Sequence, residues 1–335
     1  MNAPTPSTGR FGPTSDWQSG IAVLIPCLNE STAIAKVVHD FRTYLPEANI
    51  FVYDNGSTDG TPEIASAAGA IVRTELMRGK GNVVRRMFAD IEADVFVLVD
   101  GDDTYDARAA PVLISTLLKN SLDMVNAARQ SEVEAAYRRG HRFGNRLLTG
   151  MVARFFGNRL TDLLSGYRVF SRRFVKSFPA LASGFEIETE LSVHALQLRM
   201  PITEVSTDYR ERPTGSASKL RTYKDGFRIL QTIVYLIKEE KPLAFFSAVA
   251  AMLAVLSLAL GAPLVVTFMR TGLVPRFPTA LLAAALALMS FLSFTCGLIL
   301  DTVSRGRAET KRLAYLSVPV RFTAIMLPRE LAPSQ

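Results

Sequence analysis

The sequence has few of the residues that form disulfides or bind zinc. Its 335 residues include two cysteines, three histidines and one tryptophan. Cys27 and Cys296 fall at a predicted strand end and in an apolar segment, which implies no disulfide framework and fits a protein that faces the cytosol. Because the histidines and cysteines lack ligand spacing, a zinc site is disfavoured.

Three other signatures are missing. Residues 1–20 are rich in Pro, Thr, Ser and Gly and contain no apolar run, so we predict a disordered tail and no secretion signal. No Gly-x-Gly-x-x-Gly motif and no Walker lysine loop occurs anywhere in the chain. A dinucleotide-dependent enzyme or a P-loop NTPase is therefore disfavoured.

What the sequence does contain is apolar and basic. Hydrophobic residues make up 48%, the formal net charge is +7, and the mean hydropathy is +0.18. Part of the chain is therefore expected to sit in lipid. By itself the positive charge suits nucleic acid, anionic lipid and phosphorylated substrates equally well.

The central motif is a short apolar run that ends in carboxylates. Val95–Val99 predicts a strand buried on both faces, and Asp100-Gly101-Asp102-Asp103 follows it directly. Gly101 would let the backbone turn so that both flanking side chains point at one spot. Crowded carboxylates repel one another, and a hard divalent cation that completes its shell with substrate phosphates removes the conflict. The alternative is a plain acidic turn.

Strands and helices alternate before and after this motif. The predicted strands are Ile21–Ile25, Ile50–Tyr53, Ala70–Arg73, Val95–Val99 and Met124–Ala127. The predicted helices are Ile34–Leu45, Thr61–Ala68, Gly81–Ile91 and Ala109–Lys119. This alternation predicts an α/β domain with a mostly parallel, Rossmann-like sheet, in which ligands bind at the carboxyl ends of the strands.

Polar clusters lie at those predicted strand ends. They are Pro26–Glu30, Asp54–Gly60, Arg78–Gly81 and Asp100–Asp103. Each cluster alone could be an ordinary turn or helix cap. Four clusters on one edge of one sheet favour a binding site.

From Tyr137 to Lys219 the alternation fades and cations collect. Arg138, Arg139, Arg142 and Arg146 flank a helix start, and a loop with cations at both ends spans Arg210–Lys219. Asp162–Arg168 and Gly184–Glu188 lie between them. The alternative to a substrate-binding role for these arginines is a basic face near anionic lipid.

The C-terminal third predicts a membrane attachment. Tyr223, Phe227, Leu230, Val234 and Ile237 recur at helical spacing, which predicts an interfacial amphipathic helix. Two runs without charge, Leu243–Met269 and Thr279–Leu300, are long enough to span a bilayer. Lysine and arginine are more frequent before and after this pair than between its members, so both ends are expected to be cytoplasmic.

Together these motifs resemble the family 2 glycosyltransferases of the GT-A fold, and within them the dolichyl- or polyprenyl-phosphate sugar synthases with two C-terminal membrane helices. The resemblance covers roughly residues 21–241. The matching pieces are Pro26-x-x-Asn29-Glu30, Asp54-x-Gly56-Ser57-x-Asp59-Gly60-Thr61, Gly79-Lys80-Gly81, Asp100-Gly101-Asp102, Ser165-Gly166-Tyr167-Arg168 and Arg212-x-x-Gly215-x-x-Ser218-Lys219.

The resemblance implies roles for individual residues. The nucleotide sugar would be bound by Pro26, Asn29, Glu30, Asp54, Ser57, Lys80, Asp100 and Gly101. Mg²⁺ or Mn²⁺ would be held by Asp100 and Asp102, and the acceptor phosphate by Arg129, Arg142, Arg146, Ser165, Arg168 and Lys219. The catalytic carboxylates would be Asp102, Asp103 and Asp162. The chain departs from the mannose synthases at Thr104, where they usually carry glutamine.

The expected reaction is an inverting transfer of a hexose from a UDP- or GDP-sugar to polyprenyl phosphate. A phosphate monoester is largely ionised at pH 7 and attacks without a general base. We therefore expect Asp162, the obvious base candidate, to orient Arg168 or a neighbouring arginine instead.

The expected partners are the nucleotide sugar, polyprenyl phosphate and a lipid bilayer, with no nucleic acid and, as an alternative to a monomer, a homo-oligomer. The expected domains are a tail (1–20), a GT-A domain (21–220), an interfacial helix (221–241), a two-helix transmembrane domain (242–301) and a cytoplasmic C-terminal segment (302–335). The expected location is the inner (plasma) membrane.

Three alternatives remain open. One is a family 2 enzyme with a different lipid or glycan acceptor. A second is a processive polysaccharide synthase, which is disfavoured because its Gln-x-x-Arg-Trp motif needs a tryptophan and the chain has only Trp17. The third is an inactive membrane adaptor, against which the retained carboxylates argue.

Overall fold

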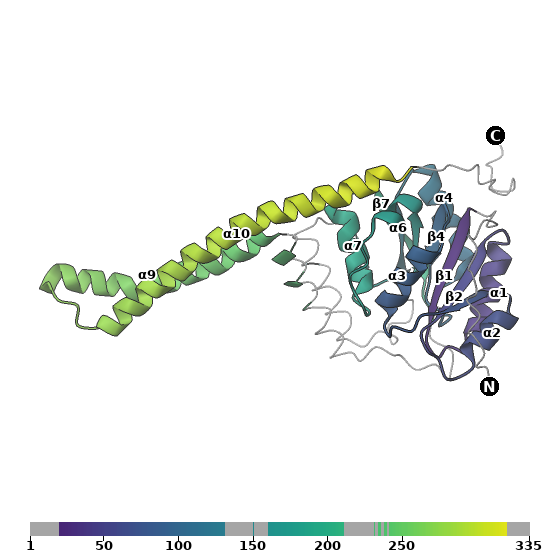
Figure 1. The fold of residues 1–335 in the computed structure, drawn as a ribbon, viewed down its shortest axis with the longest axis horizontal. Coiled ribbons are helices and arrows are strands. Elements are labelled where there is room, and N and C mark those ends of the chain that lie inside the picture. The colour runs from purple at the N-terminus through teal and green to yellow at the C-terminus, as the bar shows by residue number, and fades with distance from the viewer. Residues whose placement is uncertain are drawn as a thin grey trace, which may run out of the picture.

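The computed structural model describes residues 20–130, 150, 160–210, 231, 234–235, 238–239 and 241–319. Within them an α/β domain lies at one end of the molecule and a long pair of helices projects from it (Figure 1). The predicted fold class, a mostly parallel sheet followed by two apolar helices, is confirmed.

The domain is built on a seven-stranded sheet with the order β3-β2-β1-β4-β6-β5-β7. The strands are β1 (Ile21–Cys27), β2 (Asn49–Asp54), β3 (Ile71–Thr74), β4 (Val95–Leu98), β5 (Met124–Gln130), β6 (Arg168–Ser171) and β7 (Ile202–Asp208). β1 is parallel to both β2 and β4, and β5 is parallel to β7. Only β6 runs antiparallel to its neighbours, β4 and β5. The carboxyl ends of β1, β2 and β4 therefore meet at one edge.

Helices cover both faces of the sheet. α1 (Ile34–Tyr44), α2 (Thr61–Ala67) and α4 (Ala110–Lys119) pack on one face, with a short 3₁₀ turn, η1 (Ala107–Ala109), ahead of α4. α3 (Lys80–Asp90), α6 (Arg172–Ser177) and α7 (Ile187–Gln197) pack on the other. The apolar side chains of β1 alternate between the two resulting cores, as a strand covered on both sides requires.

Four of these elements, β6, α6, α7 and β7, come from the region where the sequence shows no clear alternation. α7 explains why. Ten of its eleven residues are buried, including Glu188, Glu190 and His194, so its sequence has no polar face to reveal a helical period. Because several of its buried side chains are polar, the pattern of apolar residues does not predict this helix.

α9 (Pro242–Thr271) and α10 (Phe277–Ser317) are long and apolar enough to cross a membrane. Only 6% and 11% of their most apolar windows are buried, unlike the core helices of a soluble protein. Serines join the two helices: Ser257 Oγ donates to the carbonyl of Ala283 at 2.7 Å, and Ser290 Oγ to that of Ala250 at 2.7 Å. Hydrogen bonds from serine across an interface of small residues such as alanine are typical of helices packed in lipid.

α10 does not end where its apolar run ends. It continues without a break past Asp301 to Ser317, so the helix crosses the expected boundary between a membrane domain and a C-terminal segment at residue 301. Its last turns return to the α/β domain, as Figure 1 shows. The expected interfacial helix at 221–241 lies mostly outside the described residues.

Polar contacts attach the end of α10 to the domain. Lys311 Nζ donates to Gln197 Oε1 at 2.9 Å, and Arg312 donates to the carbonyl of Leu198 at 2.7 Å. Tyr315 donates its hydroxyl proton to Asp123 Oδ2 at 2.7 Å. Arg173 completes the contact, because its guanidinium lies over the Tyr315 ring and donates to the carbonyl of Val318. We call these contacts the α10 docking contacts.

Candidate active site

A cavity of about 370 Å³ opens at the carboxyl edge of β1, β2 and β4. All four polar clusters that the sequence singled out contribute to its wall, as parallel strands with a common edge require. The lining residues are Pro26, Cys27, Leu28, Glu30, Asn55, Arg78, Gly79, Lys80, Val83, Asp100, Gly101, Asp102, Tyr105, Arg129, Leu164, Phe185, Glu188 and Tyr209.

The loops after β1 and β2 are joined by side chain to backbone hydrogen bonds. Ser57 Oγ accepts from the Asn29 N–H at 2.8 Å, and Asn29 Oδ1 accepts from the Thr58 N–H at 2.8 Å. Pro26 and Glu30 of the first loop line the cavity, whereas Asn29 and Ser57 do not. The structure therefore places Asn29 and Ser57 as residues that hold the two loops together.

Asp54 is buried at the end of β2, with one carboxylate oxygen turned to its own loop. Asp54 Oδ2 accepts from the backbone N–H groups of Gly56 and Ser57, at 2.9 and 3.0 Å. Asp54 Oδ1 is buried and has no hydrogen-bond partner among the described residues. A buried acceptor without a donor is costly, but Asp54 is not among the residues that line the cavity, so its expected contact with the nucleotide sugar stays a prediction.

The next residue, Asn55, positions the loop between β3 and α3, which leads to Lys80. Its side chain donates to the carbonyls of Glu75 and Met77 and accepts from the Gly79 N–H at 2.7 Å. Gly79 has φ +124°, and a Cβ there would collide with the carbonyl of Ser183. Only glycine allows this approach, which fixes Lys80 at the start of α3 beside the cavity.

Lys80 bridges two carboxylates that are far apart in the sequence. Its Nζ lies 2.5 Å from Asp100 Oδ1 and 2.5 Å from Glu188 Oε1. Burial by itself lowers the pKa of Lys80, but Asp100 and Glu188 together raise it above its usual value, so the ammonium stays charged. Burial and the nearby Asp100 raise the pKa of Glu188, which Lys80 opposes.

Asp102 is held by the residue at which the chain departs from the mannose synthases. Asp102 Oδ1 accepts from the hydroxyl of Thr104 at 2.6 Å and from its N–H at 3.2 Å. Asp102 is 3% exposed, so its orientation is fixed by Thr104 within the wall of the cavity. Thr104 thus acts on the carboxylate and does not line the cavity itself.

Gly101 and Asp103 differ from the sequence interpretation in detail. Gly101 does not have a positive φ; it is needed because a Cβ would collide with Cys27 Sγ. Asp103 has φ +57°, and its carboxylate lies 2.7 Å from Lys36 Nζ on α1. Because this backbone conformation turns Asp103 away, Asp103 does not line the cavity with Asp100 and Asp102.

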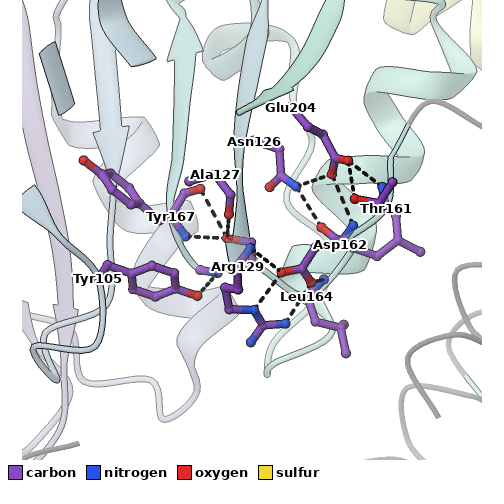
Figure 2. A network of polar contacts seen from close by, with 12 residues as sticks. Tyr105, Asn126, Ala127, Arg129, Thr161, Asp162, Leu164, Tyr167 and Glu204 are labelled. Atoms are coloured by element: carbon purple, nitrogen blue, oxygen red, sulfur yellow. Dashed lines mark hydrogen bonds and ion pairs between the residues drawn. The ribbon is translucent and has the colours of Figure 1, made fainter. Parts of the chain in front are cut away.

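Figure 2 shows how the opposite wall is built around Arg129, at the end of β5. Arg129 Nε and one terminal nitrogen donate to the two carboxylate oxygens of Asp162, at 2.7 and 2.8 Å. Burial alone raises the pKa of Asp162, but the hydrogen bonds from Arg129 hold it below its usual value. Asp162 is therefore the ionised partner of Arg129, which agrees with the expected orienting role toward an arginine.

A carboxylate on β7 fixes the loop that carries Asp162. Glu204 Oε2 accepts from the N–H and hydroxyl of Thr161, at 2.6 and 2.7 Å, and Oε1 accepts from Asn126 at 2.7 Å (Figure 2). Glu204 thus holds the loop that carries Asp162, and Asp162 in turn holds the guanidinium of Arg129.

Two of the expected phosphate-binding residues lie in the core. Arg168 is 0% exposed and donates to the carbonyls of Ser165 and Leu163 and to Ser192 Oγ. Ser165 is also 0% exposed and donates to the carbonyl of Ala127 at 2.6 Å. These positions correct the expectation: a buried guanidinium and hydroxyl with internal partners shape the loop from Asp162 to Gly166 and do not face an acceptor. Arg142, Arg146 and Lys219 lie outside the described residues.

The carboxylates of the cavity fit a hard divalent cation that takes its remaining ligands from a phosphate. Among residues 20–130, 160–210 and 241–319, no group of three His, Cys, Asp or Glu side chains is arranged to hold a metal. Asp100 and Asp102 nevertheless both line the cavity. Two carboxylates and a diphosphate supply the oxygen ligands that Mg²⁺ or Mn²⁺ prefers.

Several lining residues were given no role from the sequence, although Phe185 and Glu188 fall in the stretch Gly184–Glu188 that it named. Glu188 comes from α7, and Tyr105, Phe185 and Tyr209 add aromatic side chains to the wall of the cavity. Tyr105 and Tyr209 contact edge to face, with ring centroids 5.3 Å apart. The sequence did not reveal α7 or β7, which place Glu188 and Tyr209 at the cavity.

The sheet order and the cavity at the carboxyl ends of its strands define a protein of the GT-A fold, and comparison with known proteins identifies the family. Residues 22–178 match the family model described as glycosyl transferase family 2. The glycosyltransferase AglJ of Haloferax volcanii is 36% identical over 239 residues, which cover 71% of this chain and 77% of AglJ. The chain belongs to the family 2 glycosyltransferases.

Two further comparisons bear on the subgroup and the fold. A dolichyl-phosphate hexose transferase of Haloferax volcanii is 28% identical, over 66% of this chain and 95% of that protein. The crystal structure of glucosyl-3-phosphoglycerate synthase from Mycobacterium tuberculosis with Mn²⁺, UDP and product superposes with a TM-score of 0.54 at 24% identity, over 64% of this chain and 80% of that one. The second likeness supports the GT-A fold.

Proposed function

We propose that this glycosyltransferase moves a hexose from a UDP- or GDP-sugar to polyprenyl phosphate at the cytoplasmic face of the plasma membrane, with inversion at the anomeric carbon. The observation that carries the proposal is one cavity that is lined by Asp100, Asp102 and Lys80 and also by Arg129, in a domain joined to a pair of apolar helices.

The leaving group places the first demand on the site. As the sugar–phosphate bond breaks, negative charge develops on the nucleoside diphosphate. Lys80 lies beside the cavity at the start of α3 and would bind that charge. Asp100 and Asp102 would hold Mg²⁺ or Mn²⁺, which when bound stabilises the same charge as a Lewis acid.

The acceptor places the second demand. A phosphate monoester is largely dianionic at pH 7, so the enzyme must hold it beside another anion and need not remove its proton. Arg129 is suited to this task because Asp162 fixes its guanidinium and Tyr209 lies beneath it, 5.5 Å from ring centroid to guanidinium carbon. The likeness to a dolichyl-phosphate hexose transferase supports a lipid phosphate as acceptor.

The test is a donor and acceptor screen with the purified full-length protein in detergent. Each of a set of UDP- and GDP-hexoses is supplied with Mn²⁺ and either polyprenyl phosphate or the matching polyprenol. The expected result is a mild-acid-labile lipid product from one donor with the phosphate only, of opposite anomeric configuration to the donor. Transfer to the polyprenol or to a free glycan, or retained configuration, would instead support a family 2 enzyme with a different acceptor.

A further inference from the structure

The contact between Lys80 and Asp100 joins two groups that the proposed function assigns to different ligands. Asp100 is an expected metal ligand, whereas Lys80 is expected to bind the donor's diphosphate. In the structure the ammonium of Lys80 donates directly to Asp100 Oδ1 at 2.5 Å. An ammonium and a divalent cation that bind the same carboxylate repel each other at short range, so each weakens the binding of the other.

The two carboxylates that bind Lys80 are not equivalent. The Glu188 side chain is 7% exposed and lies in the first turn of the buried helix α7, whereas the Asp100 side chain is 28% exposed and lies on the loop after β4. Glu188 also lines the cavity, and its second oxygen, Oε2, is buried without a hydrogen-bond partner among the described residues. Glu188 is thus the more buried of the two partners of Lys80, and Asp100 is the one more accessible to a ligand.

We propose that Lys80 competes with the divalent cation for Asp100, and that Glu188 is the positioning residue that keeps Lys80 within reach of both Asp100 and the diphosphate. The proposal rests on the nucleotide-sugar function. A diphosphate offers Lys80 an anionic partner in place of Asp100. Asp100 then becomes available to the cation.

The consequence is that the metal and the nucleotide bind cooperatively. Alone, the cation must displace Lys80 from Asp100, which weakens its binding. With a nucleoside diphosphate present, Lys80 has a new partner and the obstacle is removed. Such coupling is reciprocal, so the cation must strengthen nucleotide binding by the same factor.

The experiment measures Mn²⁺ affinity of the full-length protein in detergent, from the electron paramagnetic resonance signal of free Mn²⁺, first with Mn²⁺ alone and then with UDP or GDP added. For the native chain we expect weak binding alone and at least about tenfold tighter binding with the matching nucleotide. Lys80→Met should bind Mn²⁺ alone about tenfold more tightly than the native chain, because the competitor is gone. It should also lose the part of the nucleotide effect that depends on Lys80, while the diphosphate still supplies oxygen ligands to the cation.

Two more variants separate competition from a general effect of charge. Lys80→Arg keeps the positive charge and should retain weak binding of Mn²⁺ alone. Arg78→Met removes another cation of the cavity wall, one for which the structure gives no contact with Asp100, and should change the affinity far less than Lys80→Met.

Glu188→Gln should act in the opposite direction. The amide oxygen can still accept from Lys80, but Asp100 becomes the only anionic partner of the ammonium, so Mn²⁺ alone should bind more weakly than to the native chain. A purely structural role for Glu188 would not produce opposite signs for the two variants in correctly folded proteins.

The outcomes are distinguishable from those of the proposed function. If Lys80→Met binds Mn²⁺ alone no more tightly than the native chain, or no more tightly than Arg78→Met does, the competition is refuted, whatever the donor proves to be. If the native chain binds Mn²⁺ tightly alone and neither nucleotide adds to it, the nucleotide coupling is refuted. Loss of transfer with intact coupling would count against the assigned acceptor only.

Discussion

At the scale of single residues, neighbouring carboxylates in one motif have different partners. Asp102 is held by Thr104 inside the cavity wall, while Asp103 pairs with Lys36 on the outside. A single positive φ at Asp103 separates them. The motif therefore supplies two cavity carboxylates, at Asp100 and Asp102, and one structural carboxylate.

Asp102→Asn should lower sugar transfer by orders of magnitude and leave the fold intact, because removing one of two crowded carboxylates relieves their repulsion. EDTA should abolish transfer by the native enzyme, and Mn²⁺ or Mg²⁺ should restore it. Asp103→Asn is the matched control and should keep most of the activity, since Asp103 does not line the cavity. Full activity of Asp102→Asn would remove the basis for the metal assignment.

Asp162→Asn should retain measurable transfer. The amide keeps one acceptor for Arg129 but loses a charged hydrogen bond, worth about 1.5–3 kcal/mol. We expect the apparent KM for polyprenyl phosphate to rise more than kcat falls, as measured in initial-rate assays with both substrates varied. If the variant binds both substrates normally yet is as inactive as Asp102→Asn, Asp162 is a general base after all.

His194 gives the folded state a pH dependence with a definite sign. Burial lowers the pKa of His194 to about 3, from 6.5, and the charge on Lys311 acts in the same direction. Between these pH values the unfolded chain binds a proton that the folded chain does not. Stability is therefore lost as the pH falls below 6.5, by about 1.4 kcal/mol per pH unit from this group.

His194→Gln should flatten the decrease in unfolding free energy between pH 7 and pH 5.5, a range chosen above the carboxylate titrations. The measurement is denaturant unfolding in detergent, followed by circular dichroism. His39→Gln, an exposed position on α1, should keep the native slope. Parallel slopes for the native chain and His194→Gln would contradict the burial argument.

At the scale of elements, α10 has two environments along one unbroken helix. Its first half packs against α9, and its last turns make the α10 docking contacts with the α/β domain. A helix of 41 residues is about 60 Å long at 1.5 Å per residue. This length connects the apolar hairpin rigidly to the domain that carries the cavity.

Inserting one alanine between Gly306 and Arg307 should break the α10 docking contacts and keep the packing of α10 against α9. The insertion rotates the following turns by about 100°, so Lys311, Arg312 and Tyr315 no longer face their partners. We expect transfer to polyprenyl phosphate to fall by about tenfold or more, since misplacement of reacting groups is costly. Nucleotide affinity should stay unchanged, because other elements form the cavity.

The control is one alanine inserted between Leu273 and Val274, in the turn between α9 and α10, which should leave transfer close to native. Both proteins are compared by initial rates with lipid acceptor and by nucleotide titration. Native rates for the Gly306 insertion would show that docking of α10 is dispensable.

At the scale of the whole molecule, the distribution of lysine and arginine predicts on which side of a bilayer the α/β domain lies. Arg270 and Arg276 are the only lysine or arginine residues between the apolar runs, whereas Arg305, Arg307, Lys311 and Arg312 follow the second run. By the positive-inside tendency, the turn between α9 and α10 should face outward and the domain should face the cytoplasm.

Cysteine labelling of intact cells tests this arrangement. In a Cys296→Ala background, Leu273→Cys should react with a membrane-impermeant maleimide, because Leu273 is exposed in the turn. Lys119→Cys, exposed at the end of α4, should react only after the cells are lysed. Because the remaining Cys27 is buried but lines the cavity, the Cys296→Ala chain without an added cysteine is the control for its background labelling. The reverse labelling pattern would invert the topology.

The sequence by itself determined the elements with local signals. Strands with uniform apolar runs, the loops after β1, β2 and β4, and the two long apolar helices all follow from hydrophobic period and turn chemistry, which act over a few residues. Because parallel strands share an edge, the sequence also placed the four polar clusters at one site, where the structure confirms a cavity.

Only the tertiary structure decided which side chains face that cavity. Glu188 reaches Lys80 from 108 residues away, and Arg168 is buried although its motif suggested a phosphate ligand. The sequence did not predict α7 and β6, because both elements bury polar residues and their apolar residues therefore show no clear helical or strand period. Side-chain direction depends on backbone torsions and on partners brought together by folding, as at Asp103 and Glu204, and no local pattern carries that information.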